Sequence, residues 1–451
     1  MDSVMHWLLN SVYVLLLTCL SPLIVWRMVR HGRYRRGLAA KLLGRLQRPP
    51  GVRPVVWFHA VSVGEVVQLQ KIVLEFRRAT ADRFAVLVTT STDTGFELAQ
   101  QRFPDCTVDW FPLDFSWAVR RAISRVQPVQ VVLMELELWP GFMAACRNRG
   151  IPVAIVNARL SERSFRRYLR VRGLLQPMFS GLRLIAAQSP AIAERLRLLG
   201  ARPDALQITG SIKFDGAECR DDHPGLSALR AAFRMEHSGP VLVAGSTQEP
   251  EEQLILDAWQ QLLPECPDLT LILVPRHRER FDAVAELVQQ RGCSLIRRSA
   301  GAMPVDLSAA RDSLGRPAVR LLDTIGELSA CWGLADLAFV GGSFGNRGGQ
   351  NMIEPAAWGA AVLFGPHTWN FRDVVQVFLE ANACLQLADP ADLLPALRGL
   401  LQDPAAAQRL GATARQTVQR QQGAVAVTIR LLLERCELEQ HLPVQVITRA
   451  A

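Results

Sequence analysis

Short apolar runs alternate along the chain with segments that have the pattern of helices. Such runs cover residues 55–58, 85–88, 129–134, 153–156 and 184–187 in the first half, and 241–244, 269–274, 337–340 and 361–364 in the second. Strands separated by helices are typical of parallel sheets. A polar segment that contains Pro and Gly interrupts the pattern near residues 216–225. We therefore predict an α/β fold with two doubly wound, Rossmann-like domains.

This interruption and the N-terminal pattern divide the chain into three expected parts. We assign residues 1–28 to an N-terminal membrane anchor, residues 29–220 to the first domain and residues 221–451 to the second. The pattern of residues 404–440 predicts long helices that could pack back across the pair. Ligands of such sheets bind beyond the carboxyl ends of the strands, so we expect the active site in a central cleft that the two domains face.

The N-terminal segment from Trp7 to Trp26 is mostly apolar. Its length of about 20 residues is enough for a helix to cross a bilayer. Arginines and one lysine follow between residues 27 and 48, and this asymmetry places the remainder on the cytoplasmic side of the membrane. The span is weakened by Asn10, Ser11, Ser21 and Pro22. A buried or interfacial helix therefore remains the alternative, and it would still bring the protein to a membrane.

The composition excludes several other classes. The 451 residues are 49% hydrophobic and 21% charged, which indicates globular domains rather than disorder. Nine cysteines without a Cys-x-x-Cys pair argue against a zinc cluster, so no metal is expected. The net charge of +9 is moderate, and a basic run over residues 163–172 either contacts lipid phosphates or is a solvated helix face. No nucleic-acid-binding motif accompanies it, so we expect no nucleic acid partner.

The segment over residues 339–366 has the most distinctive pattern, since it consists of an apolar strand, a glycine-rich turn, a helix and another apolar strand. Glycines at positions 341, 342, 345, 348 and 349 would let backbone amides approach a phosphate. Asn351 and Glu354 follow where they could hold a sugar or a base. Neither a Walker lysine motif nor a dinucleotide fingerprint is present. The segment therefore favours an enzyme that uses a nucleotide sugar.

In the first half, carboxylates follow two of the expected strands. Glu65, in the sequence HAVSVGE, is the candidate general base, because a partly buried carboxylate can deprotonate an attacking hydroxyl. The alternative is that Glu65 only complements a helix N-terminus. Glu135 and Glu137, in MELELWP, would share one face only if the strand continued through them. Lys213, in TGSIKFD, could meet the phosphate or carboxylate of a donor.

Two further candidate segments end strands in the second half. Arg276, in PRHRER, could hold phosphate oxygens through two parallel hydrogen bonds. Gly326 and Glu327, in DTIGEL, could bind a base or a ribose. Such short motifs also cap helices, but their common placement at strand ends supports a shared site.

Taken in order, the motifs HAVSVGE, TTSTDTG, ELELWP, NARLSERS, TGSIKFD, PRHRER, DTIGEL and GGS followed by GGQNMIEP span nearly the whole chain. Together they resemble the 3-deoxy-D-manno-octulosonic acid (Kdo) transferase family of lipopolysaccharide synthesis. The resemblance implies a GT-B fold with an N-terminal acceptor domain, a C-terminal donor domain and no catalytic metal or other cofactor. It further implies CMP-Kdo as donor, a tetra-acylated lipid A precursor with two phosphates (lipid IVA) as acceptor, and a location at the inner membrane.

The resemblance also implies roles for individual residues. Glu65 would be the base, and Glu135 and Lys213 would stabilise the transition state. The residues expected to contact CMP are Pro275, Arg276, Ile325, Gly326, Glu327, Asn351, Met352, Ile353 and Glu354. The chain departs from the family at Gln350, where histidine is common, and at Met352 and Ile353, where proline and leucine are usual. These departures concern details of nucleotide contact.

The implied reaction is a direct displacement that inverts the anomeric centre, in which an acceptor oxygen attacks Kdo as CMP leaves from the opposite face. Two alternatives remain open from the sequence. One is another GT-B enzyme that uses a UDP-sugar, such as an epimerase. The other is a non-catalytic membrane-bound module that binds a nucleotide or a lipid.

Overall fold

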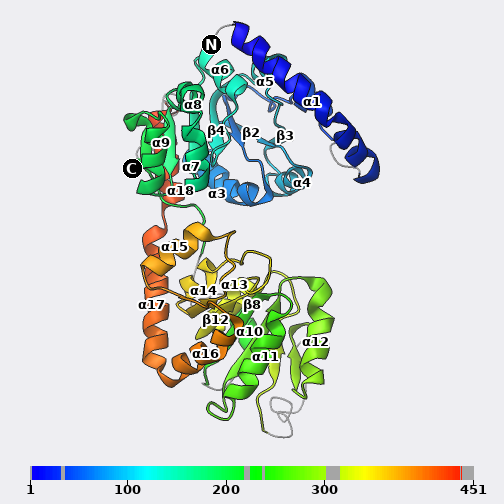
Figure 1. The fold of residues 1–451 in the computed structure, drawn as a ribbon, viewed down its shortest axis with the longest axis vertical. Coiled ribbons are helices and arrows are strands. Elements are labelled where there is room, and N and C mark those ends of the chain that lie inside the picture. Colours follow the sequence, from blue (N-terminus) through cyan, green and yellow to red (C-terminus); the bar gives the residue numbers. More distant parts are fainter. Residues whose placement is uncertain are drawn as a thin grey trace. The chain divides into compact units, whose positions relative to one another are not determined.

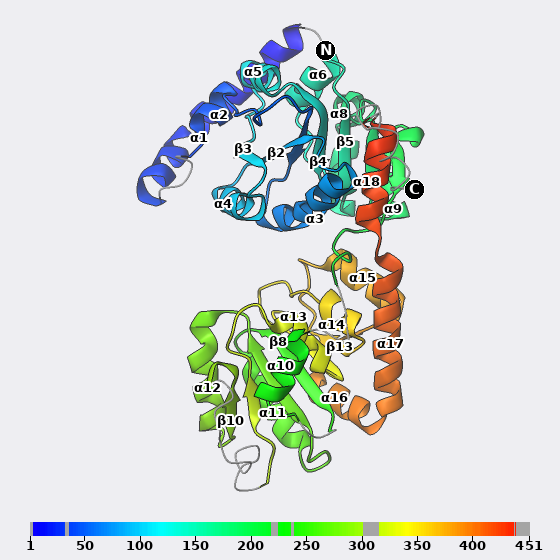
Figure 2. The same ribbon diagram turned by 180° about the vertical axis from the view of Figure 1, so that it is seen from behind.

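The computed structural model describes residues 3–31, 36–217, 224–235, 239–300, 315–436 and 438. The chain forms two compact units, Met1–Asp215 with Gln422–Ala451 and Gly216–Gln421. Each unit contains a parallel sheet of seven strands with helices around it (Figures 1 and 2). This confirms the predicted class of two doubly wound α/β domains. The segment that follows residue 421 lies in the first unit, whereas we had assigned it to the second domain.

In the first unit the strands have the order β3-β2-β1-β4-β5-β6-β7, and all neighbours are parallel. The strands are β1 (Val55–His59), β2 (Ala85–Thr90), β3 (Thr107–Trp110), β4 (Pro128–Met134), β5 (Val153–Ala158), β6 (Leu184–Ala187) and β7 (Leu206–Ile208). The helices are α1 (Ser3–His31), α2 (Leu38–Leu43), α3 (Val63–Ala79), α4 (Asp93–Arg102), α5 (Ser116–Val126), α6 (Pro140–Asn148), α7 (Glu162–Leu169), α8 (Arg172–Phe179), α9 (Pro190–Leu198) and α18 (Ala424–Arg435), with a 3₁₀ turn η1 (Pro203–Ala205).

The first sheet is buried on both faces, which explains why its strands are continuous apolar runs rather than alternating ones. Along β1, Trp57 packs with α5 and α6 on one face, while Phe58 packs with α3 and α18 on the other. The ring of Trp57 meets that of Phe142 edge to face at 5.3 Å. Figures 1 and 2 show this sheet between α3 on one side and α5 and α6 on the other.

Helix α18 belongs to the first unit, because hydrogen bonds attach the start of this helix to residues at the end of the first segment of that unit. Asp215, at the end of the first passage through this unit, accepts hydrogen bonds from the backbone N–H groups of Gly423 and Val425 at the start of α18. A carboxylate at this position also complements the positive end of the helix. Ile429 and Leu432 then bury their side chains in the core on the α3 face of the sheet.

The membrane span expected near the N-terminus is not supported. Among the helices of the described residues, none combines the length and the apolarity that crossing a bilayer requires. Helix α1 is instead attached to the first unit through its polar residues. The Asn10 amide exchanges two hydrogen bonds with Ser116, at 2.8 and 3.0 Å, and the Tyr13 hydroxyl donates to Asp114 at 3.1 Å. Asn10, one of the residues that weaken the apolar segment, therefore also docks the helix.

In the second unit the order is β10-β11-β9-β8-β12-β13-β14, again with parallel neighbours. The strands are β8 (Val241–Thr247), β9 (Thr270–Pro275), β10 (Leu295–Arg297), β11 (Val319–Leu321), β12 (Leu337–Val340), β13 (Ala361–Phe364) and β14 (Leu385–Gln386). The helices are α10 (Pro224–Ala232), α11 (Glu251–Leu262), α12 (Phe281–Gln290), α13 (Leu328–Cys331), α14 (Ile353–Trp358), α15 (Arg372–Glu380), α16 (Leu393–Gln402) and α17 (Pro404–Gln421), with 3₁₀ turns η2 (Arg278–Arg280), η3 (Arg298–Ala300), η5 (Trp332–Leu334) and η6 (Pro390–Asp392).

Helix α17 crosses the end of α14 at very short range. It packs against α14, α16 and β13, along one side of the unit (Figure 1). At the crossing, a Cβ atom on Gly411 of α17 would lie 1.9 Å from the carbonyl oxygen of Gly359, which ends α14 with φ near 85°. Only a residue without a side chain allows this approach.

We expect Gly411→Ala to destabilise the second unit by about 2 kcal/mol or more, because the clash is with backbone and cannot be relieved by a rotamer change. Gly399→Ala is the matched control, since Gly399 lies in α16 with no atom within 4 Å of an added Cβ. That control should stabilise the protein by about 0.5–1 kcal/mol through helix propensity. Thermal melts of both variants measure the difference, and equal melting temperatures would contradict the close crossing.

Candidate active site

The strand order of the first sheet reverses between β1 and β4, which are neighbours although they are not consecutive. Loops that leave adjacent strands in opposite directions open a crevice at this point, where ligands of doubly wound sheets bind. Glu65 follows β1 in the first turn of α3, and Glu135 directly follows β4. The fold therefore places both predicted carboxylates at the switch point of the first sheet.

Glu65 and the N-cap residue Ser62 are hydrogen-bonded to each other at the start of α3. The Ser62 hydroxyl accepts from the Glu65 N–H at 3.3 Å and donates to Glu65 Oε1 at 2.8 Å, while the Val61 N–H donates to Glu65 Oε2 at 3.0 Å. The carboxylate is buried, with 8% of the residue exposed. The alternative role of Glu65, at the N-terminus of a helix, is thus also present in the structure. Because a carboxylate has about four acceptor positions, these two bonds leave room for a substrate hydroxyl.

Glu135 and Glu137 do not share a strand face, because β4 stops at Met134. Glu135 adopts a left-handed backbone conformation with φ near 53°, so the chain turns away from the sheet here before α6 begins. Glu137 is half-buried in this turn. Burial raises the pKa of Glu137 to about 7, and the negative charges of Glu65 and Glu135 add to the effect. Glu137 therefore interacts with both other carboxylates, although Glu65 lies in α3 and Glu135 in the turn after β4.

Lys213 follows β7 in a turn that is attached to the centre of the sheet by Asn157. The buried Asn157 side chain accepts from the N–H of Ile212 at 3.2 Å and donates to Gln68 of α3 at 2.7 Å. Asn157, next to the last residue of β5, has a left-handed φ near 54°, and its carbonyl accepts from the Gln188 side chain at 3.0 Å. These bonds connect the loops after β5, β6 and β7 to the helix that carries Glu65. Sequence reasoning treated this segment only as a motif and missed the role of Asn157.

His59 precedes Glu65 in the same motif but has a different environment. Its ring is fully buried and stacks on Phe111 with 3.8 Å between the centroids. Burial lowers the pKa of His59 to about 3, so the ring is neutral at physiological pH, and Nδ1 lies 3.0 Å from the Thr89 carbonyl oxygen. His59 is thus a core residue that joins β1 to β2.

In the second sheet the strand order reverses between β8 and β12, and the glycine-rich turn follows β12. Three N–H groups of this turn, from Gly342, Ser343 and Phe344, donate to the carboxylate of Glu251 at 2.7, 2.8 and 3.0 Å. We had expected the amides of the glycine-rich turn to meet a phosphate. These three are bound to a side chain of α11 instead, which the sequence did not indicate because paired glutamates are common at helix starts.

Pro275 ends β9, the neighbour of β8 on the other side, and Arg276 directly follows it. Pro275 is buried, whereas Arg276 is exposed, and the backbone N–H of Arg276 donates to the Thr247 carbonyl at 3.0 Å. This bond fixes the backbone of Arg276 beside the end of β8. The guanidinium group is therefore presented from a rigid strand end.

The Ile325–Glu327 turn follows β11, and Asp323, just before it, accepts hydrogen bonds from Arg297 and Ser299. Ile325 is 76% exposed, and Gly326 has φ near 94°. Burial alone would raise the pKa of Asp323, but hydrogen bonds from Ser299 and Arg297 lower it, so this anchor is ionised. Glu327 accepts from Arg298 at 3.0 Å. The turn is thus exposed, and the carboxylates of Asp323 and Glu327 beside and within it are held by arginines.

Asn351 and Glu354 contact each other at the start of α14. The Asn351 amide donates to Glu354 Oε1 at 2.8 Å, and its oxygen accepts from the N–H of Ile353 at 3.1 Å. The side chains of Met352 and Ile353 are buried, with 0% and 2% of the residues exposed. Both residues are therefore part of the core, and the departures from the family pattern at these positions change core packing.

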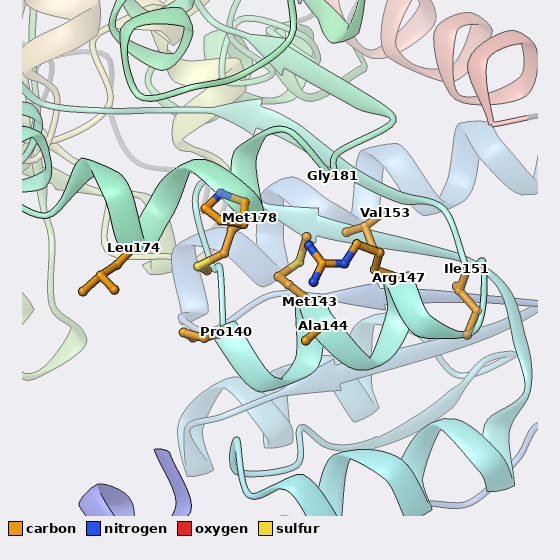
Figure 3. A pocket seen from close by; sticks show the side chains of 10 residues that line it. Pro140, Met143, Ala144, Arg147, Ile151, Val153, Leu174, Met178 and Gly181 are labelled. Atoms are coloured by element: carbon orange, nitrogen blue, oxygen red, sulfur yellow. The ribbon is translucent and has the colours of Figure 1, made fainter. Parts of the chain in front are cut away.

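A hollow on the first unit lies between α6 and α8 (Figure 3). Its volume is about 40 Å³, and its wall includes Met143 and Arg147 from α6 and Leu174 and Met178 from α8. Pro140, the first residue of α6, also lines it and follows the turn that carries Glu135 and Glu137 by a few residues. None of the predicted site residues lines this hollow.

The raised pKa of Glu137 gives stability a specific dependence on pH. The folded protein binds this proton more tightly than the unfolded chain, so the free energy of unfolding falls as pH rises from about 4.5 to about 7. We expect Glu137→Gln to raise the melting temperature at pH 8 and to change it much less at pH 5. Glu286→Gln, at an exposed position of α12, should have little effect at either pH. An equal shift of Glu137→Gln at both pH values would contradict the carboxylate cluster.

Comparison with known proteins agrees with the family suggested by the motifs. A family model described as 3-deoxy-D-manno-octulosonic-acid transferase (kdotransferase) matches residues 30–216. The 3-deoxy-D-manno-octulosonic acid transferases of Haemophilus influenzae and Bordetella pertussis are each 35% identical to the chain. The alignments cover 93% and 94% of this chain and 97% and 98% of those proteins, respectively.

A solved structure supports the fold. The UDP-GlcNAc 2-epimerase from Neisseria meningitidis covers 85% of this chain and 100% of its own, with a TM-score of 0.56 at 12% sequence identity. At this identity the similarity concerns the fold alone, and it agrees with the predicted GT-B type of two parallel-sheet domains. With the two transferases that align along nearly their whole length, these findings show that the chain belongs to the Kdo transferase family, the glycosyltransferases of lipopolysaccharide biosynthesis.

Proposed function

We propose that the protein transfers Kdo from CMP-Kdo to a hydroxyl of the tetra-acylated lipid A precursor, lipid IVA, with inversion and without a metal. The observation that carries this proposal is the carboxylate cluster at the switch point of the first sheet. Glu65 and Glu135 lie there as the motifs require, and their charges, together with burial, raise the pKa of Glu137. Transfer to a hydroxyl requires a base at the acceptor, and we assign that role to Glu65 in this cluster.

In this mechanism Glu65 takes the proton of the acceptor hydroxyl as its oxygen forms a bond with the anomeric carbon of Kdo. The bond from that carbon to the CMP phosphate breaks on the opposite face, and CMP leaves with the electron pair. The hydrogen bonds from Val61 and Ser62 hold the Glu65 carboxylate in one orientation. An oriented base needs no reorganisation when the proton moves, which lowers the barrier.

The transition state has oxocarbenium character, so positive charge on the sugar and negative charge on the leaving phosphate both need partners. We assign the first role to Glu135 and the second to Lys213 and Arg276. Three amides of the glycine-rich turn are bound to Glu251, so they are not assigned to the phosphate. Lys213 and Arg276 would thus supply the positive charge that a divalent metal supplies in other transferases.

For the donor we propose a CMP site on the second unit that uses the ends of β9, β11 and β12. Arg276 would hold the phosphate, the Ile325–Glu327 turn would contact the base or ribose, and Asn351 to Glu354 would complete the site. The exposure of Arg276 and Ile325 leaves them open to a ligand. Competition experiments should show binding of CMP in preference to UDP, and a preference for UDP would favour a UDP-sugar enzyme instead.

For the acceptor we propose the first unit, held at the cytoplasmic face of the inner membrane. Exposed arginines and apolar residues alternate over α7 and α8, among them Arg170, Val171 and Leu174, and the hollow of Figure 3 adjoins them. Val29 and Leu15 of α1 are also exposed, at 73% and 64%. Such a surface suits a lipid with phosphates and acyl chains. Flotation of the protein with anionic vesicles, compared with neutral ones, measures this association.

Because Glu65 also caps α3, its catalytic role must be separated from its structural one. We expect Glu65→Gln to lower kcat for transfer by at least about 100-fold, since a neutral amide cannot accept the proton. Ser62→Ala removes the side-chain cap of α3 and keeps the carboxylate, so it should cost about 1 kcal/mol of stability and lower kcat far less than Glu65→Gln does. Both variants should still bind CMP. Similar activities of the two folded variants would refute the base assignment.

A further inference from the structure

Glu251 is a buried carboxylate whose oxygens are bound by backbone amides from two loops. Oε1 accepts from the N–H groups of Ser343 and Phe344 at 2.8 and 3.0 Å. Oε2 accepts from those of Gly342 and Gln248 at 2.7 and 3.0 Å. The residue is 1% exposed and lies in the first turn of α11. It therefore links the loop after β8 to the loop after β12 where the strand order of the second sheet reverses.

The loop after β12 is shaped to admit this carboxylate. A Cβ atom at Gly341 would lie 2.8 Å from Glu251 Oε2 and 2.6 Å from the Ser246 carbonyl oxygen. The Ser343 hydroxyl donates to the Val340 carbonyl at 2.8 Å and accepts from the N–H of Gly365 at 2.9 Å. The glycine at position 341 is thus required by the close approach of Glu251 and the β8 loop.

Three successive N–H groups that converge on one point form an anion-binding concavity of the kind that holds phosphates in many proteins. In this protein the anion bound by these N–H groups is the carboxylate of Glu251. Bonds from N–H groups to an ionised acceptor are stronger than neutral ones, and a buried carboxylate without them would be costly. The loop and Glu251 therefore stabilise each other in one conformation.

We propose that Glu251 is a positioning residue that acts as the built-in anion of this amide cradle, and that the empty cradle would bind a small carboxylate. The same loop continues into Asn351 and Glu354, so its conformation sets where these side chains stand. The consequence for nucleotide binding rests on the proposed function. The cradle itself does not, since it is defined by contacts within the second unit.

The test removes the Glu251 side chain and supplies acetate in solution as a replacement anion. Glu251→Ala leaves a space that acetate can fill, because the substitution deletes one methylene carbon and the carboxylate, and acetate consists of one methyl carbon and a carboxylate. We expect the variant to melt at a lower temperature than the wild-type protein, and acetate to raise its melting temperature more than chloride does at equal ionic strength. The wild-type protein and Glu265→Ala, which lacks an exposed carboxylate of the same unit, should show no such difference between the salts. The absence of an acetate effect on folded Glu251→Ala would overturn the cradle.

Glu251→Gln provides a second variant if the alanine variant does not fold. Its single carbonyl oxygen can satisfy one pair of amides, while its NH₂ group faces the other pair. It should weaken CMP binding and raise KM for the donor by about 10-fold or more, with a smaller change in kcat, and acetate should not help because the cradle is filled. Gly411→Ala serves as the structural control, since it should lower stability without raising KM at a temperature where it is folded.

Two outcomes separate the proposals. If the wild-type protein binds no CMP but acetate stabilises Glu251→Ala, the cradle stands and the proposed donor is wrong. If acetate stabilises Glu251→Ala while both Glu251 variants bind CMP as the wild-type protein does, Glu251 holds the loop without positioning the site, and the positioning role is overturned.

Discussion

Both units depend on one constraint, which is that all strands of a parallel sheet end at the same edge. Each sheet has seven strands, and a loop begins at the end of each strand. The backbone N–H groups of these loops need hydrogen-bond acceptors. In this protein, buried side chains provide them. Asp114 accepts from the N–H groups of Gly141 and Phe142 at the start of α6, Asn157 holds the turn before Lys213, and Glu251 holds the loop after β12. The functional edges are rigid because their loops are bound to one another.

This arrangement gives some residues two functions. Glu65 completes the cap of α3, and the bonds that do so also orient its carboxylate. Asp114 receives the hydroxyl of Tyr13 as well as the amides of α6, and burial raises its pKa to about 6. Helix α1 is thus connected, through one carboxylate, to the helix that follows the turn of Glu135 and Glu137. Carboxylates kept partly buried near one another cost stability, as is common where sites are prepared for chemistry.

Much of the fold could be predicted because the local signals agree with one another. The apolar runs at residues 55–58 and 129–134 correspond to β1 and β4, and the carboxylates after them lie at strand ends as expected. The errors came where a contact was made with a distant part of the chain. The glycine-rich turn binds Glu251, about 90 positions earlier, and the apolar N-terminal segment docks through Asn10 on Ser116. The sequence near each of these two segments gives no sign of its distant partner, Glu251 or Ser116.

The family, the class of fold and the positions of the strand ends were determined by the sequence itself, because they follow from periodicity, from turn residues and from motifs in a fixed order. The tertiary structure decided how those motifs are used. It showed that Met352 and Ile353 are core residues, that β4 stops before Glu135, and that Glu137 interacts with Glu65 of α3. The reason is physical: burial, hydrogen bonding and the interaction of charges depend on which segments meet, and a linear pattern records only what each segment prefers alone.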